Sequence, residues 1–177
     1  MLYYSVDLKT VVRDWGRRMT YPSMDRQDRQ HYIVPALERV YTGFEVLSWP
    51  LVRAATGVFF LPHGMQKLFG FWGGDIARTA EGFAKQGLNP PTFWAYYIGC
   101  LEFFGGICLI LGLVTRPIAA LFAGFMFVAA FHVHMPIGWF WTNRGMEVPF
   151  YLLLVCLAMV IRGGGPLSVD RLLGREI

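Results

Sequence analysis

Four long apolar runs restrict what this chain can fold into more than any other feature of the sequence. They cover about residues 49–70, 92–113, 117–135 and 146–161. Runs of this kind are typical of helices that cross the hydrocarbon core of a bilayer. Only 16% of the residues are charged, against about 25% in soluble domains. We therefore predict an all-α protein in which residues 49–173 form a transmembrane four-helix bundle within a lipid bilayer.

The positions of Lys and Arg predict how the bundle is oriented. Cytoplasmic loops of membrane proteins are enriched in these residues. If the N-terminus is cytoplasmic, most of the 16 Lys and Arg lie inside, and only Lys67, Arg78, Lys85 and Arg144 lie outside. We therefore expect both termini in the cytoplasm and the first span to serve as the insertion signal. The net charge of +4 reflects this bias. Nucleic-acid binding is not expected, because no basic stripe is interleaved with exposed aromatic residues.

Residues 1–48 differ from the rest of the chain and are expected to form a cytoplasmic N-terminal extension. Between residues 5 and 19, apolar side chains recur at helical spacing while the basic side chains fall elsewhere on the helix. This pattern predicts an amphipathic helix that lies on an anionic membrane surface, or that packs on a partner or on the protein's own loops. A second short amphipathic helix is expected after Pro35.

An ionisable side chain inside the second apolar run is the main candidate for chemistry. Glu102 lies about ten residues into this run, or about 15 Å from its outer end at a rise of about 1.5 Å per residue. Such a placement costs at least about 2.5 kcal/mol and marks a functional hypothesis by default. Other polar groups are expected near the outer ends of the remaining spans, namely His63, Lys67, His132, His134 and Glu147. Together these residues predict a polar pocket in the outer half of the bundle.

Several roles for these groups remain open from the residues alone. Lys67, Glu102 and Glu147 could form a structural ion-pair network that fixes the helix register. Alternatively, the pocket binds a small polar group or a quinone head group and moves protons, because imidazoles and carboxylates at graded depth suit a proton relay. A metal site is disfavoured, because two histidines in a His-x-His sequence point about 200° apart on a helix. A haem held between His63 and His132 is a weaker alternative.

Arg53 is expected to reach the inner head groups.

Several short motifs in order resemble the DoxX family of small four-helix membrane proteins. The resemblance covers about residues 49–173 and rests on these pieces: Arg53-x-x-x-Gly57, His63-Gly64-x-x-Lys67-Leu68, Glu102-x-x-Gly105-Gly106, Leu111-Gly112-Leu113-x-Thr115-Arg116, Asn143-x-Gly145 with Glu147, and Gly163-Gly164-Gly165-Pro166-x-Ser168-x-Asp170. The resemblance implies a multi-pass protein of the bacterial inner (cytoplasmic) membrane. It also implies a subunit of a redox system, because named members resemble parts of a thiosulfate:quinone oxidoreductase or of assemblies for thiol and oxidative stress defence.

The first functional hypothesis is therefore a quinone-linked redox membrane subunit without an intrinsic cofactor. It would need another membrane or redox protein subunit for electrons, because the sequence has no iron–sulfur motif or nucleotide fingerprint. Dithiol chemistry is not expected, because the three cysteines form no Cys-x-x-Cys pair. The alternative is a non-catalytic accessory or assembly subunit of a larger respiratory or photosynthetic complex. A small-molecule transporter is less expected, because no inverted repeat is seen. A homo-oligomer remains open.

Overall fold

The computed structural model describes residues 33–34 and 37–174 and divides the chain into two units, Met1–Gly43 and Phe44–Ile177. The amphipathic helix expected over residues 5–19 lies outside the described residues. The short helix expected after Pro35 is not a separate element, because one continuous helix, α2 (Glu38–Phe69), contains both this stretch and the first predicted span. Pro50 lies where the two stretches meet, but the helix continues through it.

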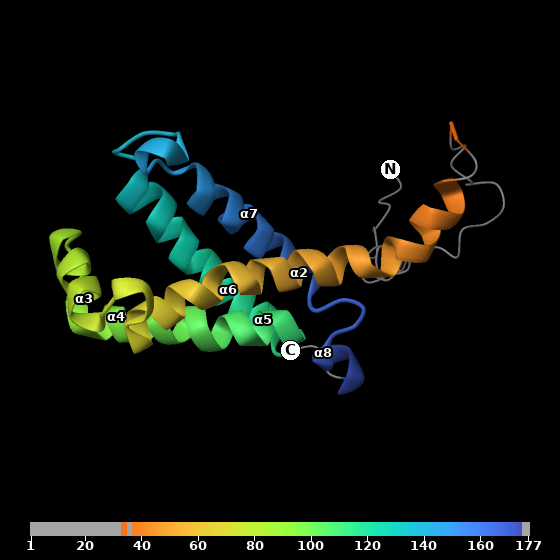
Figure 1. The fold of residues 1–177 in the computed structure, drawn as a ribbon, viewed down its shortest axis with the longest axis horizontal. Coiled ribbons are helices and arrows are strands. Elements are labelled where there is room, and N and C mark those ends of the chain that lie inside the picture. Colours follow the sequence, from red (N-terminus) through yellow and green to blue (C-terminus); the bar gives the residue numbers. More distant parts are fainter. Residues whose placement is uncertain (1–32, 35–36, 175–177) are drawn as a thin grey trace, which may run out of the picture. The chain divides into compact units, whose positions relative to one another are not determined.

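Unit 2 consists of helices that follow one another through short connections (Figure 1). After α2 come a 3₁₀ turn η3 (Phe71–Gly73), α3 (Ile76–Lys85), α4 (Pro91–Cys100), a π-helical segment η4 (Leu101–Gly105), α5 (Gly106–Leu111), α6 (Thr115–Phe127), a second π-helical segment η5 (Val128–His134), a 3₁₀ turn η6 (Trp141–Asn143), α7 (Glu147–Arg162) and α8 (Val169–Leu172). Since η4 joins α4 to α5 without a break, Pro91–Leu111 is one long helix, and α6 with η5 forms another.

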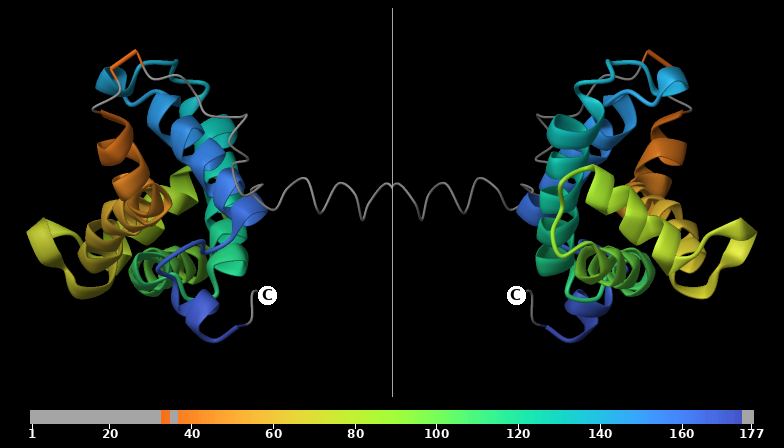
Figure 2. Two further views of the ribbon diagram at one scale, coloured as in Figure 1. Left: turned by 90° about the vertical axis from the view of Figure 1, so that its right-hand side faces the viewer. Right: turned by 90° about the vertical axis from the view of Figure 1, so that its left-hand side faces the viewer.

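Three of these helices are long and apolar enough to cross a membrane: Glu38–Phe69, Pro91–Leu111 and Thr115–His134. The fourth predicted span corresponds to α7, which has 16 residues. At about 1.5 Å per residue α7 is about 24 Å long, whereas the hydrocarbon core is about 30 Å thick. It packs beside α6, as both views of Figure 2 show. The protein is therefore an all-α, multi-pass membrane protein with three helices of full spanning length and one shorter helix.

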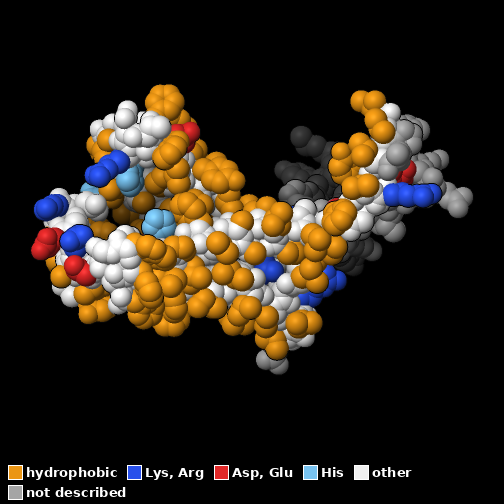
Figure 3. Space-filling view, in the orientation of Figure 1, with side chains coloured by type: hydrophobic (Ala, Val, Ile, Leu, Met, Phe, Trp, Pro, Cys, Tyr) orange, Lys and Arg blue, Asp and Glu red, His pale blue; other side chains and the backbone are white. Residues whose placement is uncertain are grey.

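Large apolar side chains also cover the outside of unit 2, as Figure 3 shows for one face. They come from all four long helices, and include Leu51, Phe93, Phe104, Phe127, Tyr151, Leu154 and Ile161. A soluble domain rarely exposes so much contiguous apolar surface. Lipid is the solvent in which this surface is stable.

Close helix contact in the middle of the bundle depends on glycine. A Cβ atom at Gly57 would lie 2.5 Å from the carbonyl oxygen of Gly106, and one at Gly64 would collide with the backbone of Phe103. Small residues at such crossings let two membrane helices approach closely. The crossing therefore fixes the distance between the C-terminal end of α2 and η4. Between the helices, the rings of Phe60 and Phe122 stack with centroids 4.0 Å apart and form part of the buried core.

The other end of the bundle is held by a buried arginine. Arg53 is 1% exposed and does not extend to the head groups, which corrects the prediction made from sequence. Its guanidinium donates to the carbonyl oxygens of Leu109 at 2.8 Å and Leu167 at 3.0 Å, and more weakly to that of Ile110. The last carbonyls of a helix lack intrahelical donors and carry partial negative charge. Arg53 therefore caps α5 and ties it to α2.

The segment Gly163–Asp170, called here the C-terminal clamp, completes this arrangement. The Asp170 carboxylate accepts hydrogen bonds from the backbone N–H of Val114 at 2.6 Å and of Thr115 at 2.9 Å, so it caps the N-terminus of α6. The backbone N–H of Asp170 donates to the carbonyl oxygen of Gly112 at 2.9 Å. Trp49 donates its indole N–H to the carbonyl of Gly163 at 2.9 Å. The clamp therefore joins α2, α7 and the α5–α6 turn. Ser168 caps α8, because its side chain accepts a hydrogen bond from the backbone N–H of Arg171.

Replacement of Gly112 by alanine is expected to destabilise this end of the bundle. Gly112 has φ +69°, and a Cβ atom there would collide with the Arg53 guanidinium. The left-handed conformation alone costs about 1–2 kcal/mol for a residue with a Cβ atom. We expect a clearly lower midpoint of thermal unfolding in detergent for Gly112→Ala. Gly124→Ala is the matched control, because a Cβ atom at Gly124 meets nothing within 4 Å. Equal midpoints for the two variants would contradict the role given to Arg53.

Candidate functional site

An ion pair joins α2 to the π-helical segment of the second long helix. The Lys67 Nζ atom lies 2.6 Å from the Glu102 Oε2 atom, and the two side chains are 18% and 5% exposed. Lys67 also lies 3.5 Å from the carbonyl oxygen of His63, one turn earlier on α2. A charged hydrogen bond shielded from water is stronger than a neutral one. The pair thus neutralises a carboxylate that would otherwise be unpaired in the membrane.

The local backbone around Glu102 is a second unusual feature. Glu102 lies within η4, where hydrogen bonds follow the wider π-helical pattern. Single π turns within α-helices are frequent at functional sites, because they change the direction in which side chains project. The other π-helical segment, η5, carries His132 and His134. The helices Pro91–Leu111 and Thr115–His134 therefore both change from α-helical to π-helical hydrogen bonding at the segments that carry candidate residues.

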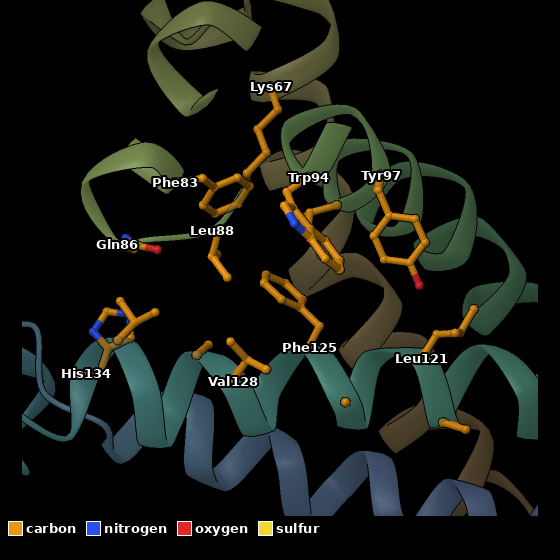
Figure 4. Close-up of a pocket in the computed structure, with 15 residues that line it drawn as sticks. Lys67, Phe83, Gln86, Leu88, Trp94, Tyr97, Leu121, Phe125, Val128 and His134 are labelled. Carbon is orange, nitrogen blue, oxygen red and sulfur yellow. The ribbon is translucent and has the colours of Figure 1, made fainter. Parts of the chain in front are cut away.

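The larger cavity lies between the α3–α4 side of the bundle and α6–η5. Its volume is about 540 Å³, within the range of small-molecule sites. Figure 4 shows Phe83, Leu88 and Trp94 facing Phe125 and Val128 across it. Lys67, Gln86 and His134 are among the few polar side chains that line it. It is called here the aromatic cavity, and it combines flat apolar walls with a few polar groups.

A second cavity of about 320 Å³ lies on the α7 side of the ion pair. Its lining includes Glu102, His63 and His134, with Trp141 and Arg144 from the connection before α7. Arg144 adopts φ +62°. We call this space the polar vestibule. Figure 3 shows histidine side chains beside a hollow at this end of unit 2.

The ion pair stands at the boundary between the two cavities. Lys67 lines the aromatic cavity and Glu102 lines the polar vestibule, although their charged atoms are in contact. Phe125, Ala129 and His134 line both spaces. The two cavities therefore share a wall from α6–η5 and meet at the Lys67–Glu102 pair.

Four of the six candidate residues come together and two do not. His63, Lys67, Glu102 and His134 line one or both cavities. The Nδ1 atom of His134 lies 2.5 Å from the carbonyl oxygen of Arg144, which sets the ring orientation. His132 lines neither cavity, and its Nε2 atom lies 3.0 Å from the carbonyl oxygen of Gln86.

Glu147 is also absent from the lining of both cavities. Its carboxylate accepts a hydrogen bond from the backbone N–H of Trp141 at 3.0 Å and so stabilises the loop before α7. The proposed three-membered network of Lys67, Glu102 and Glu147 is therefore reduced to the first two residues. Among the described residues, no three His, Cys, Asp or Glu side chains are grouped so that they could hold a metal ion. His63 and His132 do not share a cavity that could hold a haem between them.

The aromatic lining was missed when the sequence was considered alone. Trp94, Ile98 and Glu102 recur at intervals of four residues, so they share one helix face. Phe125 and Ala129 have the same spacing on the facing helix. This spacing was the signal in the sequence from which the cavity lining could have been predicted. It is indistinguishable from ordinary apolar packing until the helices are placed against one another.

Loss of Lys67 is expected to destabilise the protein by leaving a buried carboxylate unpaired. Removal of one partner of a buried ion pair costs about 3–5 kcal/mol. We expect Lys67→Met to lower the thermal midpoint strongly, and the double variant Lys67→Met, Glu102→Gln to recover most of the loss. Lys85→Met is the control, because Lys85 is exposed on α3. Additive effects of the two single substitutions would show that the pair has no energetic coupling.

The comparisons with known proteins identify the family of this chain. The DoxX family profile matches residues 48–135. The chain is 33% identical over 120 residues to "Putative oxidoreductase CatD" of Bacillus subtilis (strain 168), covering 68% of this chain and 82% of that protein. It is 29% identical over 132 residues to "Inner membrane protein YqjF" of Escherichia coli (strain K12), covering 71% and 92%. No solved structure matches the chain with statistical significance. The chain therefore belongs to the DoxX family of membrane proteins.

Proposed function

We propose that this protein is a membrane subunit of a quinone-linked redox system and that it binds the quinone head group in the aromatic cavity. The observation that carries the proposal is a cavity of about 540 Å³ with aromatic walls that contains one end of a buried ion pair. Flat aromatic walls suit a planar ring, and a few convergent polar groups suit its oxygens. The name of the Bacillus relative, which describes an oxidoreductase, supports the same class of function.

Lys67 and His134 are the groups proposed to contact the oxygens of the ring. Lys67 supplies positive charge and N–H donors, and His134 supplies an imidazole nitrogen at the shared wall. The rim of the cavity carries Tyr97 and Leu121, which are 37% and 45% exposed. This rim lies on helices that cross the membrane. It therefore gives a quinone tail a route into the hydrocarbon region.

The same proposal includes a location and a partner. The excess of Lys and Arg on one side supports an orientation with both termini in the cytoplasm. The relative from Escherichia coli is named as an inner membrane protein, which supports the bacterial inner membrane as the location. Electrons are proposed to come from a redox carrier on another membrane or soluble subunit.

Filling the aromatic cavity is expected to abolish quinone binding. Gly124 lines this cavity, and a side chain added there has open space before it. We expect Gly124→Phe to lose the binding of decylubiquinone, measured by quenching of tryptophan fluorescence in lipid nanodiscs. Leu154→Phe is the matched control, because Leu154 is exposed on α7 and lines neither cavity.

Unchanged affinity in Gly124→Phe, or no binding by the unaltered protein, would contradict the proposal. The same result would favour the alternative of a non-catalytic accessory subunit. In that alternative, the Lys67–Glu102 pair holds α2 against η4 and has no ligand to contact.

A further inference from the structure

The polar vestibule has a composition that differs from that of the aromatic cavity. Its charged and titratable lining comes from three parts of the chain: His63 on α2, Glu102 on η4, and His134 with Arg144 at the α6–α7 connection. The connection itself is exposed, as residues 139–144 all are. The vestibule therefore reaches from an exposed loop to a carboxylate that is 4% exposed.

Glu102 faces this vestibule while its ion-pair partner faces the other cavity. Only Lys67 of the two lines the aromatic cavity, and only Glu102 lines the vestibule. The 2.6 Å contact between their charged atoms joins the two spaces. Glu102 and Lys67 therefore lie where a proton could pass from the vestibule to the aromatic cavity.

We propose that the polar vestibule is a water-filled proton entrance and that Glu102 passes protons from it to Lys67, which delivers them into the aromatic cavity. This inference rests on the proposed function, since it supplies the protons that reduction of a quinone consumes. It assigns to the vestibule a role separate from ligand binding.

The proposed transfer balances in protons and electrons. The quinone receives two electrons from the redox carrier of the partner subunit, which makes its oxygens basic. The Lys67 ammonium group gives one N–H proton to a quinone oxygen and becomes a neutral amine. The Glu102 carboxylate takes a proton from a hydronium ion that arrives through the vestibule, which leaves water, and passes this proton to the amine, which restores the ion pair. Two such cycles supply the two protons of the quinol.

The neighbouring groups fit this order of transfer. Arg144, His63 and His134 face the vestibule and can hydrogen-bond water there. Ordered water in a protein cavity needs two to four polar partners, and these side chains with Glu102 provide them. The other residues that line the vestibule are apolar or aromatic, so these side chains are the ones that would hold water in it.

The test is the reaction of Glu102 with a water-soluble carbodiimide and an amine nucleophile in nanodiscs, read by peptide mass spectrometry. Modification of Glu102 is counted either as its adduct with the added amine or as its amide cross-link to Lys67, whose Nζ atom lies 2.6 Å away. Val148 lines the vestibule and not the aromatic cavity, so Val148→Phe plugs the entrance alone. We expect modification of Glu102 in the unaltered protein and in Gly124→Phe, and its loss in Val148→Phe. Exposed Glu81 on α3 is the internal reference in each sample.

A second variant keeps the test valid if Val148→Phe does not fold. Cysteine is close in size to valine, so Val148→Cys is expected to fold, and a water-soluble methanethiosulfonate then plugs the vestibule after folding. The unaltered protein, which has cysteines at 100, 108 and 156, receives the same treatment as a control. We expect the capped variant to lose modification of Glu102, and the treated control to retain it.

Three results would overturn the inference: no modification of Glu102 in any sample, modification that persists after the vestibule is plugged, or loss of modification in Gly124→Phe. These readings do not depend on quinone. A failure of quinone binding in the earlier experiment would overturn the proposed function, whereas a failure here would remove the proton entrance alone.

Discussion

The contact between Lys67 and Glu102 is the interaction on which the half of the bundle with the two cavities depends. A carboxylate within the hydrocarbon region is stable only with a partner, and the partner comes from a different helix. The position of α2 relative to η4 is therefore restricted by charge as well as by packing. The glycines at 57 and 64 bring the two backbones close enough for the lysine side chain to reach. Steric and electrostatic requirements act on the same pair of helices, which explains why the cavities on either side have a fixed wall between them.

Buried charged groups have different kinds of partners at the two ends of the bundle. Near Glu102, two opposite charges pair directly. Near Arg53, the cation is instead surrounded by backbone carbonyls, and the Asp170 carboxylate is satisfied by backbone N–H groups. The second solution uses the unsatisfied ends of helices as counter-charges. Neither Arg53 nor Asp170 lines either of the two cavities, which suits a structural end. The first leaves space on both sides, which suits a site that exchanges a ligand or a proton.

Much of the fold could be predicted from the sequence, because length and hydropathy alone limit what lies in a bilayer. The three long spans follow from this argument. The partners of individual polar residues could not be predicted in this way. Glu147 was placed at the right level along the bundle, yet it finds a backbone N–H six residues earlier in the chain. Arg53 was expected in the head groups because long basic side chains near a helix end usually extend there. The open carbonyls of α5, which attract it inward, depend on a turn whose shape the sequence pattern does not reveal.

The C-terminal clamp has a consequence for how the protein is made. Its donors and acceptors belong to the last part of the described chain, whereas the turn and the helix that they secure are synthesised well before. The N-terminus of α6 must therefore enter the bilayer without its Asp170 cap, and it acquires this cap only after α7 has been inserted. A nascent chain released before the clamp is made would keep the bonds between its first two spans, but it would lack those that join the α5–α6 turn and Trp49 to the clamp.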